Sequence, residues 1–171
     1  MRKVIYLLMM CAGVLLTSCE KEEIGGTATK ALAGEWVVTV DQVDEAGNLV
    51  HKDLFGVGHF LLNTFNTAAN VPTEMWLDDN GGFWEFKVKV DTDCKALTFK
   101  TNTPQTDIIN GCEVKLDGGK VLLNAATTPS GMPADSIVFY VSFDDDSYGS
   151  AYGYAKHRFS GYRYTGFAAD E

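Results

Sequence analysis

The side chains best able to do catalytic chemistry are few and scattered along this chain. The three histidines, His51, His59 and His157, are isolated, and no His-x-x-x-His or paired-carboxylate spacing indicates zinc. The run at 148–153 comes nearest to a serine nucleophile elbow, but its spacing is wrong for Gly-x-Ser-x-Gly. We therefore expect no catalytic residue, no metal site and no cofactor, and the balance is against an enzyme.

Two acidic runs could offer oxygen ligands to a hard cation. They are Asp78-Asp79-Asn80 and Asp144-Asp145-Asp146-Ser147. Calcium prefers clustered carboxylates and carbonyls, but neither run has the spacing of an EF-hand loop. Acidic residues that close hairpin turns are the better-supported interpretation of both runs.

The first 18 residues predict an export signal. Arg2 and Lys3 precede an apolar run at 4–16, which is shorter than the roughly 20 residues that a membrane-spanning helix needs. Leu16-Thr17-Ser18-Cys19 then matches the bacterial lipobox, in which the cysteine sulfur takes a diacylglyceryl thioether before cleavage. We expect Cys19 to be the site of lipid attachment. The alternative is an ordinary signal peptide with a chance cysteine, or a core helix.

Residues 19–30 predict an acylated tether. Glu20-Lys21-Glu22-Glu23 resembles the surface-export signal of lipoproteins in certain Gram-negative bacteria, and a solvated charge run is the alternative. Small residues at 24–30 then suit a flexible linker. The resemblance implies an outer-membrane lipoprotein exposed at the cell surface, which its acyl chains would hold at the membrane.

Cys94 and Cys112 lie in the part of the chain that would be exported, where a disulfide can persist. Such a bond would close a loop of 17 intervening residues. It would contribute about 3 kcal/mol to stability. Two free thiols are the equal alternative, and neither state indicates a function.

From residue 31 onward, the pattern predicts strands joined by turns. Phe83 to Val90 is the clearest case, because apolar and charged residues alternate there with a period of two. Turn signals at 78–82, 117–119 and 129–133 separate the apolar runs. We expect strands at 35–43, 57–65, 73–78, 83–91, 95–101, 111–117, 120–126, 136–144 and 151–167. Such a series predicts one all-β domain over 31–171, folded as an antiparallel barrel or sandwich.

Gly34-Glu35-Trp36, at the start of the first expected strand, favours the barrel. It resembles the Gly-x-Trp mark of lipocalins and related calycin barrels. In that family the tryptophan plugs the closed end, and an arginine of the last strand packs across it, a contact of roughly 1–2 kcal/mol. The resemblance implies an up-and-down barrel of about eight strands. Its closing residues would be Gly34, Trp36 and Arg163, with Arg158 as the other candidate arginine.

A second resemblance covers most of 31–171. The segments 64–70, 75–79, 83–90 and 161–167 resemble those of lipoproteins known as lipid-binding putative hydrolases. The resemblance implies a calycin-like barrel on a secreted lipoprotein, with a lipid or another apolar molecule as ligand. The hydrolase part of the name brings no catalytic motif to this chain. Tyr162 stands where the family often has a histidine before the arginine of the closing strand.

The inward-facing apolar residues leave two outcomes open. They would either fill the barrel or line a cavity for one small molecule. Aromatic residues near the C-terminus could form a core strand with surface tyrosines, or a mouth for the ligand. We expect ligand contacts from Trp76, Trp84, Phe86, Phe99, Phe139, Tyr152 and Tyr154.

The net charge of -9 argues against a nucleic acid partner, because phosphate binding needs clustered Lys and Arg. We expect a membrane-anchored lipoprotein that binds a lipid or small hydrophobic molecule without chemistry. One alternative is an accessory subunit of an envelope or nutrient-uptake assembly that binds a protein or a glycan. The third and weakest alternative is a lipid-ester hydrolase.

Overall fold

The computed structural model describes residues 25–170. Strands dominate this part, which also contains the short helix α2 (Gly149–Tyr152) and the 3-10 turn η1 (Ala168–Asp170). None of the helices between residues 25 and 170 has the length and apolar character needed to cross a membrane. The predicted signal at 1–18 and the predicted lipid attachment site, Cys19, lie outside the described residues.

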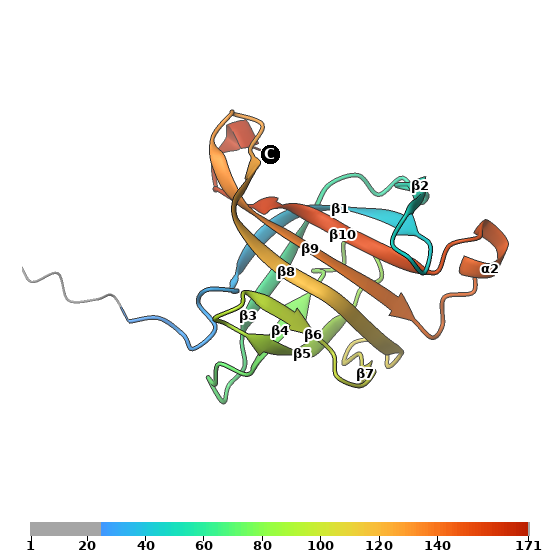
Figure 1. The fold of residues 1–171 in the computed structure, drawn as a ribbon, viewed down its shortest axis with the longest axis horizontal. Coiled ribbons are helices and arrows are strands. Elements are labelled where there is room, and N and C mark those ends of the chain that lie inside the picture. Colours follow the sequence, from blue (N-terminus) through green and yellow to red (C-terminus); the bar gives the residue numbers. More distant parts are fainter. Residues whose placement is uncertain (1–24, 171) are drawn as a thin grey trace, which may run out of the picture.

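Eight antiparallel strands of the described chain close into a barrel (Figure 1). Each strand pairs with the next barrel strand along the chain, and the last pairs with the first. This confirms the predicted all-β, up-and-down barrel. The strands are β1 (Gly34–Val43), β3 (Phe60–Asn66), β4 (Glu74–Asp78), β5 (Lys87–Asp93), β6 (Thr98–Lys100), β8 (Glu113–Thr127), β9 (Pro133–Phe143) and β10 (Lys156–Arg163).

Strand β1 completes the barrel because both of its edges are paired. One edge joins β10 in continuous register, from Trp36 opposite Arg163 to Val43 opposite Lys156. The other edge pairs first with β3 and then with the short strand β2 (Leu49–Lys52). A second short strand, β7 (Gln105–Thr106), pairs with the start of β8.

Side chains fill the interior of the barrel. The alternation of each strand turns one face inward, and the inward residues form one buried cluster. Phe139 stacks on Phe159 with ring centroids 4.8 Å apart, and Phe99 lies 5.6 Å from Phe139. Hollows of about 330 Å³ lie instead on the outside, one along β5, β6 and β8 and one beneath the β8–β9 hairpin. Of the two outcomes that the sequence left open, the filled interior is the one found.

The predicted strand at 83–91 is wrong in its first part, because β5 begins only at Lys87. Asp79 is the reason. Its buried carboxylate accepts the backbone N–H groups of Phe83, Trp84, Glu85 and Phe86, which a strand would donate to its neighbour. Residues 83–86 therefore form a loop around this carboxylate.

The predicted turn at 117–119 is also wrong. Residues 113–127 form one long strand, and a bulge interrupts its register between Asp117 and Lys120. Glycines are required at this bulge. A Cβ atom on Gly119 would lie 2.4 Å from the carbonyl oxygen of Phe99, and Gly118 has a φ of +62°.

Three other predicted strands begin too early. The strand expected from residue 95 begins at Thr98, because the N–H groups of Lys95 and Ala96 donate to the carboxylate of Asp93 in a turn. The strand expected from residue 57 begins at Phe60, because Gly56 and Gly58 adopt positive φ in the preceding loop. The strand expected from residue 151 begins at Lys156, because α2 occupies the preceding segment and ends at Gly153, which has a φ of +73°.

Candidate functional site

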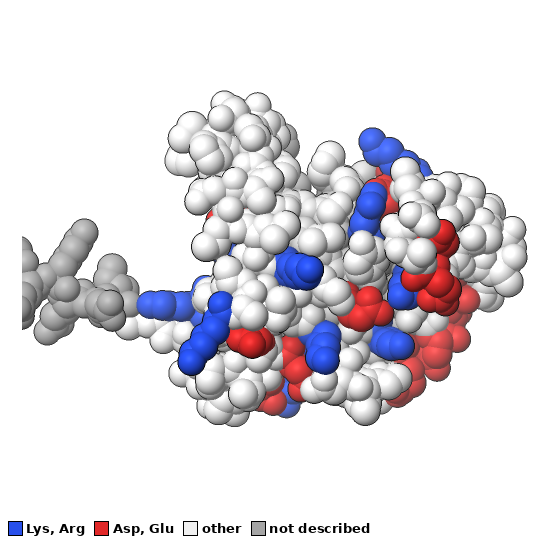
Figure 2. Space-filling model, in the orientation of Figure 1, with Lys and Arg blue, Asp and Glu red and all other residues white. Residues whose placement is uncertain are grey.

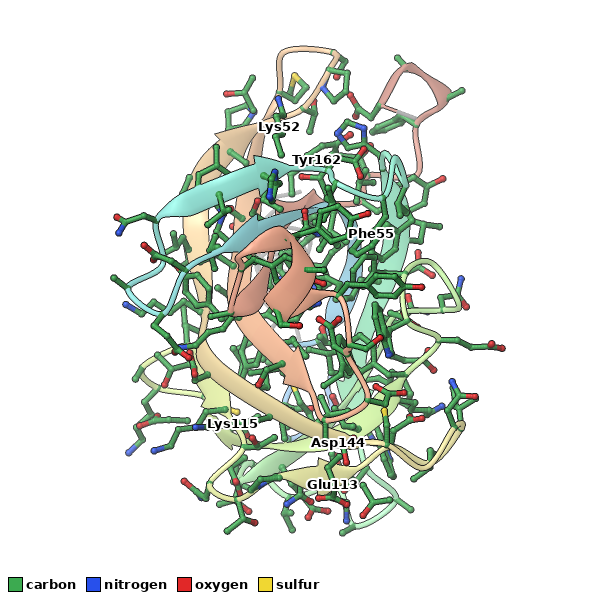
Figure 3. All side chains as sticks on the ribbon, turned by 90° about the vertical axis from the view of Figure 1, so that its right-hand side faces the viewer. Lys52, Phe55, Glu113, Lys115, Asp144 and Tyr162 are labelled. Carbon is green, nitrogen blue, oxygen red and sulfur yellow. The ribbon has the colours of Figure 1, made fainter. Side chains whose placement is uncertain are left out.

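One end of the barrel is surrounded by aromatic rings from separate segments, and Figure 3 looks onto this end. The rings have a buried floor and an exposed rim. Phe143, Tyr154 and His157 are buried, whereas Phe55, Tyr148 and Tyr152 are exposed. We call this end the aromatic mouth and define it by Phe55, Phe83, Trp84, Phe143, Tyr148, Tyr152, Tyr154 and His157.

Phe55 lies at the centre of the rim. Its ring centroid is 5.8 Å from that of Phe83, 6.5 Å from Trp84 and 5.7 Å from Tyr148. These are ordinary separations for tilted and edge-to-face aromatic pairs. A residue with 37% of its surface exposed thus covers rings from the β4–β5 loop and from the segment before α2. Phe55 therefore forms the outer cover of the mouth.

The β2–β3 loop that carries Phe55 is fixed at its base. Asp53 accepts the backbone N–H groups of Val57 at 2.8 Å and of Gly58 at 3.0 Å. The N–H of Leu54 donates to Gln42 at 3.0 Å. Gly56 and Gly58 follow Phe55 with positive φ, a conformation that glycine adopts without steric cost.

Trp84 forms the opposite wall of the mouth. Its ring stacks on Phe143 with centroids 4.9 Å apart and planes 9° from parallel. Its Nε1 donates to Asp145 at 3.1 Å, which sets the orientation of the indole. The loop around Asp79 holds Trp84 in this place, so the acidic residue positions the aromatic one.

A hydrogen-bonded network runs beneath the rings. Nε2 of the fully buried His157 lies 2.9 Å from Asp146, and its Nδ1 lies 3.4 Å from the Gln42 amide nitrogen. Because that amide nitrogen is a donor, Nδ1 of His157 must accept its hydrogen bond. Nε2 must therefore carry the ring proton and donate a hydrogen bond to Asp146. Tyr154 donates its hydroxyl to the same carboxylate at 2.9 Å. The network therefore holds His157 as a neutral imidazole.

Burial sets the protonation states in this network. Burial lowers the pKa of His157 below its usual value, although Asp146 acts in the opposite direction. Burial raises the pKa of Tyr154, and its hydrogen bond to Asp146 adds to the increase. Both groups are thus kept uncharged near neutral pH, while Asp146 accepts from both.

We expect the stability of the protein to depend on His157 below pH 6.5. The pKa of this residue in the folded state lies below its ordinary value of 6.5, so folding favours the neutral imidazole. That contribution is complete above pH 6.5 and is lost as the pH falls toward the lowered pKa. Urea unfolding between pH 7 and pH 5 should show a smaller fall in the free energy of unfolding for His157→Gln than for wild type. Identical pH slopes would contradict this assignment.

Comparison with known proteins shows the family of this chain. A family model described as lipid-binding putative hydrolase matches residues 21–168. The chain belongs to this family. A search of the curated proteins finds no match. The description of the lipid-binding putative hydrolase family raises two separate questions. The first is where a lipid could bind, and the second is which residue could act in hydrolysis.

For hydrolysis, the best candidate for a general base in the mouth is the buried His157. A general base must reach the hydroxyl or water that it activates. In His157 both ring nitrogens are already engaged, by Asp146 and by Gln42, and the ring is fully buried. These hydrogen bonds join β1, β10 and the loop that contains Tyr154. Because both nitrogens are used, neither ring nitrogen of His157 is available to a substrate.

The structure separates the predicted ligand residues into three groups. Trp84, Tyr152 and Tyr154 belong to the aromatic mouth. Phe86, Phe99 and Phe139 lie in the filled interior and are 0–2% exposed. Trp76 lies on the outer face of β4, where Lys89 Nζ is 5.7 Å from its ring centroid. The mouth brings three of the predicted residues together and leaves the other four elsewhere.

The mouth also contains residues that were not among the predicted ligand contacts. Phe55 and Phe83 lie in loops, and His157 is one of three isolated histidines. One local signal was available for Phe55. The Gly-x-Gly sequence at 56–58, directly after Phe55, indicates a loop at this position.

The opposite end of the barrel holds the predicted closing residues. Trp36 is fully buried, and the guanidinium carbon of Arg163 lies 4.3 Å from its ring centroid. Arg163 also donates to the carbonyl of Ala33 at 2.8 Å and to Asp135 at 3.2 Å. A Cβ on Gly34 would lie 2.2 Å from Arg163 Nη1, so a larger residue at this position would displace the end of the arginine from its place over Trp36.

The two cysteines of the described domain are free thiols, so the disulfide alternative is wrong. Cys94 lies beside the carbonyl oxygens of Ala28 and Pro72. Cys112 lies close to Asp144 and Asp145. The loop after β5 and the start of β8 therefore do not form the hairpin that a bond between these residues requires.

Cys112, Asp144 and Asp145 form a group in which one potential ligand atom from each residue lies within 4.8 Å of the others. Asp144 already accepts the N–H of Glu113, and Asp145 accepts from Trp84. Burial and then the neighbouring carboxylates raise the pKa of the Cys112 thiol to about 11, which opposes the thiolate that a metal ion would need. The acidic run at 144–146 serves as a set of loop acceptors.

Proposed function

We propose that this protein is an acylated lipoprotein whose aromatic mouth binds a lipid or small hydrophobic molecule without chemistry. The observation that supports this proposal most is the partly exposed cluster of aromatic rings around Phe55. Because side chains fill the barrel interior, an apolar ligand would lie across the mouth, between the Phe55 loop and the rings beneath it. The family description supports a lipid as the ligand.

Anchoring at the outer membrane is part of the same proposal. The lipobox that ends at Cys19 supports acylation, and the Lys-Glu-Glu sequence at 21–23 supports exposure at the cell surface. A triacylated cysteine carries enough buried chain to hold a domain at a membrane. Mass spectrometry of the protein purified from membranes should show a mature chain that begins at Cys19 and carries the mass of the acyl groups.

Ligand binding at the mouth is tested with the neutral fluorescent probe N-phenyl-1-naphthylamine. We expect its fluorescence to rise on binding, and Phe55→Ala to weaken binding by about tenfold, because the variant removes the ring that covers the probe. Phe65→Ala is the matched control, since Phe65 lies on β3 beside Lys87 and away from the mouth. Equal affinities for the two variants would contradict the mouth as the binding site.

The chemical class of the natural ligand can be identified from the molecule that the protein retains. Native mass spectrometry after exposure to a bacterial lipid extract should detect a lipid on the wild-type protein and little on Phe55→Ala. Incubation with fluorogenic esters should give no turnover. Turnover that His157→Gln abolishes would instead establish the protein as a lipid-ester hydrolase.

A further inference from the structure

The β8–β9 hairpin extends beyond the rim of the barrel. The pairing of β9 with β10 ends at Ser136 opposite Tyr162, whereas β8 and β9 continue together to Thr127 and Pro133. Figure 1 shows this end of the hairpin standing clear of the barrel, with the C-terminal turn η1 packed against it. We call residues 122–134 and 166–169 the apolar lobe.

The surface of the apolar lobe lacks charge. Residues 121–134 contain no Asp, Glu, Lys or Arg, in a chain of which 22% is charged. Leu123, Met132 and Phe167 are each 60% or more exposed. Figure 2 shows the lobe as a projection of white atoms, while red atoms gather toward the end that carries α2. An exposed apolar surface of this kind marks an interaction site.

The lobe is a fixed part of the fold, and two carboxylates that flank it, those of Asp135 and Asp170, form hydrogen bonds within it. Asp170 is fully buried and accepts the N–H of Ser130 at 2.9 Å and the hydroxyl of Thr165 at 2.6 Å. Asp135 accepts the N–H of Asn124 at 3.0 Å. These bonds tie the C-terminal turn to the hairpin and leave the outer surface apolar.

The chain enters the barrel at the same end as the lobe. Arg163 contacts both places, because it donates to Ala33, just before β1, and to Asp135, at the base of the lobe. Cys19 lies six residues before Gly25, the first described residue. Six residues span at most roughly 20 Å. An acyl group on Cys19 would therefore hold this end of the barrel close to a bilayer.

We infer that the apolar lobe inserts into the interface of the bilayer that holds the acyl anchor. This inference rests on the proposed acylation of Cys19. The lobe projects from the barrel and has no charged residue at 122–134, which suits insertion among lipid headgroups. A net charge of -9 provides no attraction to anionic lipids, so apolar contact is the available means of binding. The aromatic mouth then faces away from the membrane.

Hydrogen exchange of the acylated mature chain tests this arrangement on neutral phosphatidylcholine vesicles. We expect exchange in the lobe to slow by about tenfold relative to detergent micelles. The loop at 108–111 is an internal control, because Ile108 and Ile109 are also exposed but lie beside the mouth, where Asn110 binds Glu85. Unchanged exchange in the lobe would overturn the inference while leaving acylation intact.

A second measurement isolates the lobe from the anchor. The unacylated mature chain, which lacks residues 1–18 and carries Cys19→Ser, should sediment weakly with the same vesicles. Leu123→Ser combined with Met132→Ser should weaken this partition by about tenfold. Leu49→Ser combined with Ile108→Ser is the matched control, since both residues are more than half exposed and lie outside the lobe. Equal losses in the two double variants would overturn the inference. So would a concentration-dependent dimer of this unacylated mature chain that only the lobe variant abolishes.

Discussion

Replacing Asp79 with alanine is expected to lower the free energy of unfolding by about 3–5 kcal/mol. The carboxylate is fully buried and accepts five backbone N–H groups, from Gly81, Phe83, Trp84, Glu85 and Phe86. Without it, those donors lose their partners inside the protein, and the loop that carries Trp84 loses its fixed path. Urea unfolding at pH 7, followed by tryptophan fluorescence and circular dichroism, measures the change.

Asp78→Ala is the matched control for this prediction. Asp78 is the preceding residue, but its carboxylate pairs with Lys87 at 3.1 Å near the surface and accepts one N–H, from Asn80. Its loss should cost about 1 kcal/mol or less. Asp79→Asn should fall between the two alanine variants, because an amide keeps one acceptor oxygen. Similar losses for Asp78→Ala and Asp79→Ala would show that the buried carboxylate does not organise the loop.

Phe139→Ala should lower the free energy of unfolding by about 3–5 kcal/mol, because it opens a cavity in a filled barrel. Phe139 is fully buried between Phe99 and Phe159. A dry apolar cavity of this kind accepts a small apolar molecule. Benzene should therefore restore part of the lost stability of the variant, and it should leave wild type unchanged.

Phe167→Ala provides the contrast, since the same side chain is removed from a position that is 69% exposed. This variant should change the free energy of unfolding by about 0.5 kcal/mol or less. If Phe139→Ala were equally mild, or if benzene stabilised wild type, the barrel interior would already contain room for a ligand. The ligand site would then move from the mouth to the interior.

The barrel could be predicted from the sequence because its signal is local. Val88 and Val90 alternate in sequence with Lys87 and Lys89, and the structure places the valines and the lysines on opposite faces of β5. Several strands repeat this period of two, so the all-β class follows from short windows. The number of strands does not, because the two strands expected at 111–117 and 120–126 are one strand, β8. The position of Trp36 at the start of the first strand was equally visible.

The mouth could not be predicted in the same way because its contacts join distant segments. Asp79 withdraws N–H groups from the segment with the clearest strand pattern, and nothing in the alternation reports that competition. Phe55 meets Tyr148 across more than 90 residues. Such contacts depend on which strand ends meet at one end of the barrel, and that arrangement exists only after the sheet has closed.

Closure of the barrel by its two terminal strands has a consequence for the order in which the protein can fold. The eight residue pairs between β1 and β10 join the first and last strands of the barrel, so β1 keeps an open edge until residues 156–163 arrive. Pairing across such a long separation is slow, typically milliseconds to seconds. During that interval the edges of β1 and β9 are open to strands of other chains. A chain that stops before Lys156 would keep these edges permanently, so C-terminal truncation should cause aggregation rather than a smaller stable barrel.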